Sequence, residues 1–238
     1  MKTAATILLV CLTIVISQPA AAESLWEKIL RITGITATPS QQKAPGEEMA
    51  SGGMIWIGDP ATGTRRRVRD DGEFRSPIFA PDDSTILALR NGWLWRMDAE
   101  TGKGDKAHHL STVTKLIGKD RDDPDKILVL REENGKEAPA FLSLKSGSLT
   151  DIPYDAQSAQ DRNLLNHLRG WERDYGKVSV YPKAQRRESV VGPVEWQDVF
   201  FKKGDAEPIN VSRSDGDSCG QPSLSSDGSK VAYIRVTP

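Results

Sequence analysis

The sequence predicts an all-β fold, a small β-propeller of about four blades with four antiparallel strands in each blade. Short apolar segments recur along the chain, and turns rich in Gly, Pro and Asp separate them. The repeat spacing is about 40 to 50 residues, which is the period of a propeller blade. The 238 residues also include 20 Gly and 14 Pro, many for a helical protein because both residues interrupt helices.

Residues 1–22 are predicted to be a secretory signal peptide. Lys2 precedes an apolar run, and Ala20 to Ala22 supply the small residues of a cleavage site. The run is too short to cross a bilayer comfortably, since a spanning helix needs about 20 apolar residues. We therefore expect cleavage after Ala22, a periplasmic or secreted protein, and no stable membrane insertion after cleavage.

Residues 23–53 are predicted to form a short helix and a flexible linker, followed by the propeller over 54–238. The helix would run from Ser24 to Ile32, with its apolar residues on one side. It either docks on the domain or is a frayed end, and the sequence leaves both open. The linker is rich in Thr, Pro, Ser, Gln, Ala and Gly.

The first repeated element is a Pro- and Asp-containing turn that leads into a strand ending in Arg. Ser76–Ser84 aligns with Gln221–Ser229, and the strands that follow are Ile86–Arg90 and Val231–Arg235. Fainter copies place Asp123 before Ile127–Arg131, and Asp174 before a strand from Val178.

The second repeated element is a strand with a shared Trp, followed by an Asp-x-x-Thr-Gly turn. Met54–Gly63 aligns in this way with Trp93–Gly102. Asp and Gly suit this turn because Asp can accept hydrogen bonds from the backbone ahead and Gly tolerates positive φ. The shared residues, Trp56 and Trp95, are predicted to belong to the core rather than to a ligand platform.

The two ends of the repeat region complement each other. The region opens with third and fourth strands and closes with first and second strands, so Met54–Val68 and Pro222–Val236 are predicted to pair as one composite blade. Closure of this kind removes exposed sheet edges. The other blades are predicted near Phe74–Leu116, Ile117–Pro153 and Leu164–Ser212. Leu164–Trp171 breaks the strand pattern and is predicted to form a helical turn.

These repeats resemble the Pro-Asp-containing, WD40-like repeats of TolB-like propeller proteins. Ser76–Ser84, Trp93–Gly102 and Pro222–Ile234 carry the resemblance, which rests directly on about a third of the chain. It implies a non-catalytic propeller that binds a protein or peptide in the cell envelope. TolB-type propellers have more blades, and this chain lacks room for the separate N-terminal domain of TolB, so the resemblance does not make it TolB itself.

The residues that could carry chemistry are few. His108 and His109 point to opposite faces of a strand, so they cannot readily share a metal ion. Gly216–Gly220 places Ser218 beside Cys219, which fits a nucleophile turn or, more simply, a loop between blades. We predict no catalytic residue, cofactor or metal site, and a buried Cys219. The 32 basic and 33 acidic residues also speak against nucleic-acid binding.

One set of residues is a candidate partner-binding site. Arg90, Arg131 and Arg235 occupy equivalent positions in three repeats, so a propeller would place them on one face. They could bind an acidic peptide or an envelope protein, because guanidinium groups form forked, charge-assisted hydrogen bonds. Alternatively, each Arg bridges neighbouring blades by pairing with a turn Asp such as Asp98.

The sequence therefore predicts an exported, non-catalytic binding module that is a monomer or a weak dimer. Two alternatives stay open: a small secreted hydrolase or lyase built on a propeller, and a structural protein that associates with itself.

Overall fold

The computed structural model describes residues 27, 29, 34 and 52–237. The predicted signal peptide lies outside these residues, and so does most of the predicted helix and linker. Glu27 and Ile29 are helical, and Ile29 is buried in an apolar cluster with Leu128 and Leu164. Within the described part of the chain, every helix is too short or too polar to cross a membrane.

The described chain consists almost entirely of β-strands. In chain order they are β1 (Gly53–Gly58), β2 (Arg65–Phe79), β3 (Thr85–Arg90), β4 (Trp93–Asp98), β5 (Gly104–His109), β6 (Val113–Lys119), β7 (Lys126–Glu133), β8 (Lys136–Ser143), β9 (Leu149–Asp151), β10 (Arg173–Asp174), β11 (Val178–Ser189), β12 (Gly192–Lys203), β13 (Ile209–Asn210), β14 (Ser218–Leu224) and β15 (Val231–Val236). The helix α2 (Ala159–Arg169) lies between β9 and β10.

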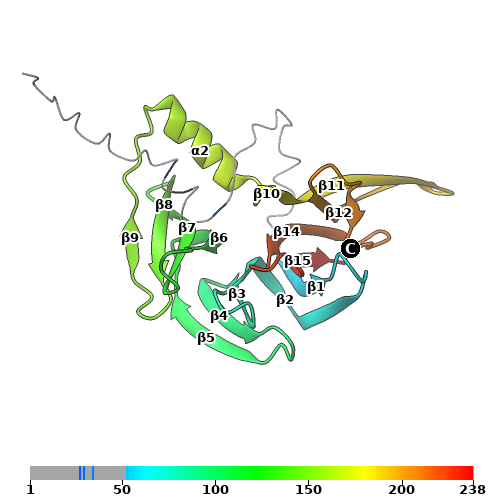
Figure 1. Cartoon of the computed structure of the whole chain (residues 1–238), viewed down its shortest axis with the longest axis horizontal. Helices are drawn as coiled ribbons and strands as arrows, with labels where there is room; N and C mark the ends of the chain where they lie inside the picture. The colour runs from blue at the N-terminus through cyan, green and yellow to red at the C-terminus, as the bar shows by residue number, and fades with distance from the viewer. Residues whose placement is uncertain (1–26, 28, 30–33, 35–51, 238) are drawn as a thin grey trace, which may run out of the picture.

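The strands pair into three antiparallel sheets. A seven-stranded sheet has the order β14-β15-β1-β2-β3-β4-β5, and two four-stranded sheets have the orders β6-β7-β8-β9 and β10-β11-β12-β13. Figure 1 shows the sheets arranged in an arc, with α2 between the two ends of the arc. The predicted all-β fold is confirmed.

The predicted pairing between the two ends of the repeat region is present. β1 pairs with β15, so that Met54 lies opposite Arg235 and Gly58 lies opposite Val231. Strands from the beginning and the end of the described region thus share one sheet.

The seven-stranded sheet arises because β2 serves two sets of strands. Its first half, Arg65–Arg69, pairs with β1, and its second half, Arg75–Phe79, pairs with β3. Gly72 and Glu73 have positive φ between the halves, and Ser76 has positive φ within the second half, where the register with β3 shifts. The pairings therefore give three sheets instead of about four separate blades, and they do not close into a hydrogen-bonded ring.

Two predicted boundaries are wrong. Val113–Leu116 belongs to β6, the first strand of the next sheet, and does not end the blade before it. Leu164 and Leu168 belong to α2, and the following sheet starts only at Arg173. The predicted helical turn is present as three turns of helix, which Ser158 caps by accepting a hydrogen bond from the Asp161 backbone N–H.

The second strand is buried on both faces in three of the four repeats, and β11 in the fourth repeat is the exception. Ile86–Leu89, Ile127–Leu130 and Val231–Ile234 are fully buried stretches within β3, β7 and β15. Because neighbours cover both faces, these strands appear in the sequence as continuous apolar runs and not as alternating ones. The core is thus built from the segments on which the repeat was identified.

Candidate functional site

The three predicted arginines lie at the ends of β3, β7 and β15, and each is paired with a carboxylate. Arg90 contacts Asp71 at 2.6 Å, Arg131 contacts Asp151 at 2.8 Å, and Arg235 contacts Asp217 at 2.5 Å. Each pair joins strands or flanking residues of the same sheet. Each of the three ion pairs therefore lies within one hydrogen-bonded sheet, and Asp71 lies between the half of β2 that pairs with β1 and the half that pairs with β3.

Asp98 is not a partner of these arginines. Its carboxylate accepts hydrogen bonds from the backbone and hydroxyl of Thr101 at 2.7 and 2.8 Å, within its own turn. Those bonds hold the pKa of Asp98 below its ordinary value. The turn explains the Asp-x-x-Thr-Gly pattern of the repeat.

Aromatic rings take the faces of two of the guanidinium groups. Arg235 lies over Trp56 at 4.8 Å from the ring centroid, and Arg90 lies over Phe74 at 5.1 Å. The indole N–H groups of Trp56 and Trp95 are buried without a hydrogen-bond partner. A carboxylate thus holds each of these two guanidinium groups at its edge, and an aromatic ring covers its face. Binding of a partner by the three arginines stays a prediction.

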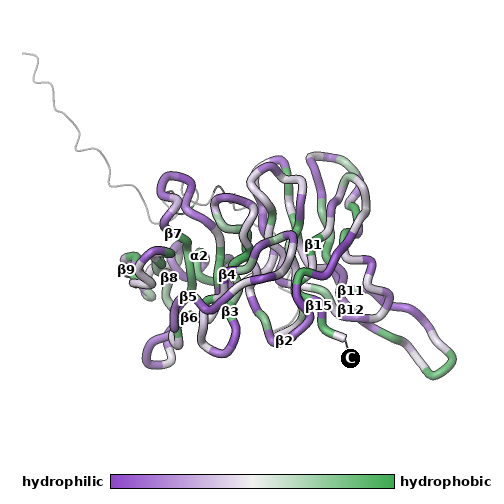
Figure 2. The backbone as a smooth tube through the Cα atoms, turned by 90° about the horizontal axis from the view of Figure 1, so that it is seen from below, coloured by the Kyte–Doolittle hydropathy of each residue, from purple (hydrophilic) through white to green (hydrophobic). Residues whose placement is uncertain are grey.

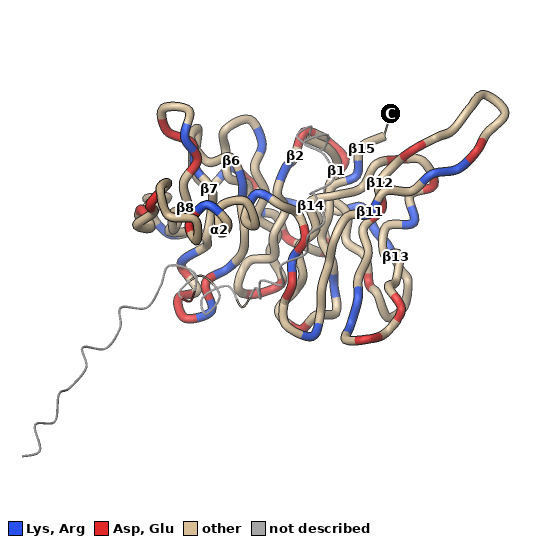
Figure 3. Tube along the Cα trace, turned by 90° about the horizontal axis from the view of Figure 1, so that it is seen from above, with Lys and Arg blue, Asp and Glu red and all other residues tan. Residues whose placement is uncertain are grey.

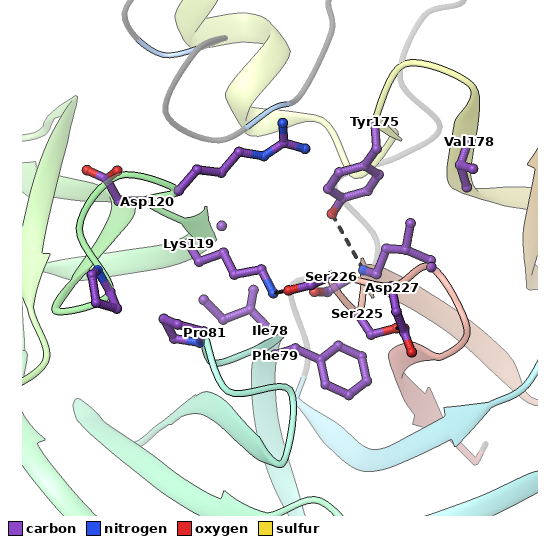
Figure 4. Close-up of a pocket in the computed structure, with 16 residues that line it drawn as sticks. Ile78, Phe79, Pro81, Lys119, Asp120, Tyr175, Val178, Ser225, Ser226 and Asp227 are labelled. Carbon is purple, nitrogen blue, oxygen red and sulfur yellow. Dashed lines mark hydrogen bonds between the residues drawn. The ribbon is translucent and has the colours of Figure 1, made fainter.

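A second candidate site is a cavity on the side of the molecule where β3, β7 and β15 begin, opposite the three arginines. It has a volume of about 570 Å³, and residues from all three sheets line it (Figure 4). The lining comes from the ends of the first strands β2, β6 and β14, from the start of β11, and from the turns beside them. Its members include Phe79 and Pro81, Lys119 to Arg121, Tyr175 and Val178, and Ser223 to Gly228.

Lys119, at the end of β6, connects two of these turns across the cavity. Its Nζ donates to Asp83 Oδ1 at 2.8 Å and to the Ser226 hydroxyl, and Ser226 N donates to Asp83 Oδ2 at 2.9 Å. The network joins the end of β6 to the β2–β3 turn and to the β14–β15 turn. A lysine held in this way fixes the cavity wall, because moving it would break contacts to two separate segments.

Tyr175 joins the β10–β13 sheet to the same cavity. Its hydroxyl accepts a hydrogen bond from Leu224 N at 3.5 Å (Figure 4). Removal from water raises the pKa of the Tyr175 hydroxyl, so that it is a neutral group at ordinary pH. Ile78, Phe79 and Val178 add apolar wall. The cavity therefore combines apolar surface with hydroxyl, carboxylate and ammonium groups.

The predicted loop Gly216–Gly220 ends at Asp217, because Ser218 and Cys219 begin strand β14. Ser218 is half-buried, whereas the other nucleophilic side chains beside it are buried. Cys219 is 0% exposed, as the sequence predicts, and burial raises the pKa of its thiol to about 12. Ser212 and Ser214 are also buried, and both hydroxyls donate to Asp198 Oδ1, at 2.6 and 2.7 Å. Groups without solvent access cannot reach a substrate, so this cluster links β12 to the segment before β14.

The histidines are dispersed. The His108 Nε2 atom lies 2.8 Å from the Leu144 carbonyl oxygen, the His109 ring contacts Trp93 at a tilt of 59°, and His167 lies in α2. Over residues 52–237 and the three described positions before them, no three His, Cys, Asp or Glu side chains form a group suited to a metal ion.

Sequence reasoning missed the cavity, although the repeat contained its signal. The turns that line it include Pro81, Asp120, Tyr175 and Asp227, which lie in or beside the four copies of the Asp-containing turn. The repeat pattern marks where strands and turns lie along the chain. It does not show that the turns meet at one place, because that depends on the curvature of the whole arc.

The comparisons with known proteins found similarity in solved structures alone. No family model and no curated protein matches the chain. A putative TolB from Agrobacterium tumefaciens is 16% identical over 75% of this chain and 60% of its own, with a TM-score of 0.34. TolB from Acinetobacter baumannii is 13% identical over 79% of this chain and 47% of its own, with a TM-score of 0.33.

The AtxE2 isopeptidase, in its apo form, is 10% identical over 82% of this chain and 44% of its own, with a TM-score of 0.29. The chain spans less than two thirds of each of these structures. Two of the three are TolB structures, one of them of a putative TolB, and TolB-like propeller proteins are the family that the repeats of this chain resemble. The TM-scores are low, so the account of the blades and the cavity rests on this chain's own residues.

Proposed function

We propose that this chain is an exported, non-catalytic, TolB-like propeller that binds a protein or peptide segment in the cell envelope, and that the cavity of about 570 Å³ is where it binds. The observation that carries the proposal is the convergence of turns from all three sheets on that cavity. Its volume lies within the range of about 300 to 1,000 Å³ that is usual for ligand sites.

The chemistry of the lining supports a peptide as the occupant. Apolar side chains such as Phe79 and Val178 can pack against a side chain of the peptide. The exposed Ser226 hydroxyl, which accepts from Lys119 Nζ, can donate its hydrogen to a peptide carbonyl. Lys119 and Asp227 offer charges of both signs. Rigid walls also suit recognition, because a preformed site loses little conformational entropy on binding.

The four-blade ring belongs to the same proposal. If β2 counts as the last strand of one blade and the first of the next, four sets of four strands surround the cavity. Helix α2 then fills the place between the β6–β9 and β10–β13 sheets. Export rests on the predicted signal peptide, residues 1–22.

A photo-crosslinking experiment tests the binding surface. The full chain is expressed in cells with a photoreactive amino acid at Ser226, beside the cavity, or at Asn134, in the hollow that Arg131 helps to line. Reproducible linkage of one envelope protein from Ser226 supports the cavity. Linkage from Asn134 alone moves the site to the arginine surface, and linkage from neither position overturns the proposal.

A cavity-blocking variant tests the same site independently. Ser226→Trp places a large ring at the exposed mouth of the cavity, and Lys145→Trp adds the same ring to an exposed turn outside it. The yield of the crosslinked partner should fall about tenfold or more with Ser226→Trp and stay unchanged with Lys145→Trp. Equal yields would contradict binding in the cavity.

A further inference from the structure

The β11–β12 hairpin extends far beyond the sheet to which it belongs. β10 pairs only with Ser179 and Val180, and β13 pairs only with Phe200 and Phe201. From the pair Pro182–Val199 to the pair Ser189–Gly192, the two strands pair only with each other. At about 3.4 Å per residue, this ribbon is roughly 25 Å long. Figure 2 shows it projecting from the body with an apolar tip.

The tip exposes two valines that the turn does not require. Val190 and Val191 are 106% and 95% exposed. Gly192, with φ 117°, supplies the positive φ of this short turn, so any residues could fill the two positions before it. An isolated two-stranded hairpin is at best marginally stable in water. The ribbon thus has features of an element that is completed by another chain.

One edge of the ribbon is open only in its middle, at residues 195 and 197. On β12, Val199 N donates to Ser212 Oγ at 2.9 Å and Val199 O accepts from Val211 N at 2.8 Å, so the outer side is occupied there. The backbone N–H and C=O groups that face away from the partner strand recur at every second residue. Those of residue 193 therefore also point away from β11, like those of Val199. Residue 193 is Pro and has no N–H to donate.

The other edge is open. Pro182 lies opposite Val199, whose backbone groups face outward, so the backbone of Pro182 faces outward as well. Because outward groups recur at every second residue, those of Ala184, Arg186 and Glu188 also point away from β12. The Ala184 carbonyl accepts from the Gln185 side chain, as expected for an outward group. Within the described residues, these three have no backbone partner outside the hairpin. Such an edge is a template for pairing with another strand.

The open edge is complementary to itself in one register. When two copies of β11 run antiparallel with Arg187 at the centre, Arg186 of each copy faces Glu188 of the other, and Ala184 faces Val190. The outward groups of both strands then meet, as an antiparallel ladder requires. A shift of two residues either way places Arg186 opposite Arg186 or Glu188 opposite Glu188, and like charges directly opposite are destabilising.

We propose that a second copy of this chain pairs with the β11 edge in that register, and forms a two-fold symmetric dimer through a four-stranded ribbon. The tip valines then lie beside the base of the other copy's ribbon. The same register places the two Arg187 side chains opposite each other on the other face of the ribbon. There the ion pair of each Arg187 with its own Asp215, at 2.6 Å, offsets the like-charge repulsion. Figure 3 shows the charged middle of the ribbon and its uncharged tip.

Charge reversal tests the register. Sedimentation velocity of the full mature chain, from micromolar to several hundred micromolar, should show a concentration-dependent dimer. Arg186→Glu and Glu188→Arg each create two like-charge contacts across the edge, and each should weaken the dimer about tenfold or more. The double variant Arg186→Glu/Glu188→Arg, and an equimolar mixture of the two single variants, restore opposite charges and should restore the dimer.

Two further variants serve as controls. Glu207→Arg reverses an exposed charge outside the ribbon and should leave the dimer unchanged. Ala184→Pro removes an outward N–H without affecting the β11–β12 ladder, and should abolish the dimer while far-ultraviolet circular dichroism stays unchanged. A monomer at every concentration, or a dimer that is insensitive to Arg186→Glu, would overturn the proposal.

Discussion

Asp198 is 2% exposed and still carries a charge. Burial alone would raise its pKa, but hydrogen bonds from Ser212, Ser214 and Asn210 outweigh burial and hold the pKa below its ordinary value. The charge is therefore stabilised by fixed donors on the segments that follow β12. Buried polar groups of this kind specify how neighbouring segments pack, because removing one partner leaves the others unpaired.

His167 should make the protein sensitive to mild acid. Burial, with Arg173 and Lys115 nearby, lowers the pKa of His167 to about 4. Between about pH 6.5 and 4 the unfolded chain then binds a proton that the folded chain does not, so stability falls as the pH falls. We expect a loss of roughly 1–2 kcal/mol across this range, less than the full shift implies because the ring is partly exposed.

Urea unfolding at pH 7, 6, 5 and 4.5 measures the effect. His167→Leu should flatten the pH dependence, and His109→Leu, on the exposed surface beside Trp93, should leave it as it is. An unchanged slope in His167→Leu would show that other groups cause the acid sensitivity.

At the level of elements, the sequence predicts strands that are buried on both faces better than strands at the periphery. β3 and β15 were predictable because Ile86–Leu89 and Val231–Ile234 are continuous apolar runs behind Asp-containing turns. The predicted blade boundary between Leu116 and Ile117 divides β6, because Val113–Lys119 has neither a continuous apolar run nor an Asp-containing turn before it. The continuity of β2 and the length of the ribbon depend on pairing between strands, which single-sequence patterns do not contain.

Removing β15 should unfold the protein. This strand lies between β14 and β1, and four consecutive residues of it, Val231–Ile234, are 0% exposed. Truncation after Lys230 exposes two sheet edges and the core, and we expect loss of the cooperative thermal transition. Truncation after Val236 keeps the strand and should melt like the full chain. A truncated chain that kept its transition would mean that the closing pair is dispensable.

At the scale of the molecule, α2 fills the place between the ends of the arc. Leu164 is 1% exposed and packs in a cluster with Ile117 and Leu130. Leu164→Ala should cost about 3 kcal/mol of unfolding free energy, since buried Leu-to-Ala changes cost about 2–5 kcal/mol. Amide exchange should quicken most in β6–β9. Gln160→Ala, at an exposed position of the same helix, should change the unfolding free energy little. Equal effects of the two substitutions would contradict the inference that the apolar face of α2 stabilises the β6–β9 sheet.

The pairing of β1 with β15 also sets the order in which the chain can fold. The β6–β9 sheet consists of neighbouring hairpins, so it can form as soon as its residues are synthesised. The seven-stranded sheet must wait for β15, whose partner β1 was made near the start. Contacts between such distant residues slow folding, because loop closure costs entropy before the contact forms. The sheet of a nascent chain therefore stays incomplete until its C-terminal strands have been synthesised.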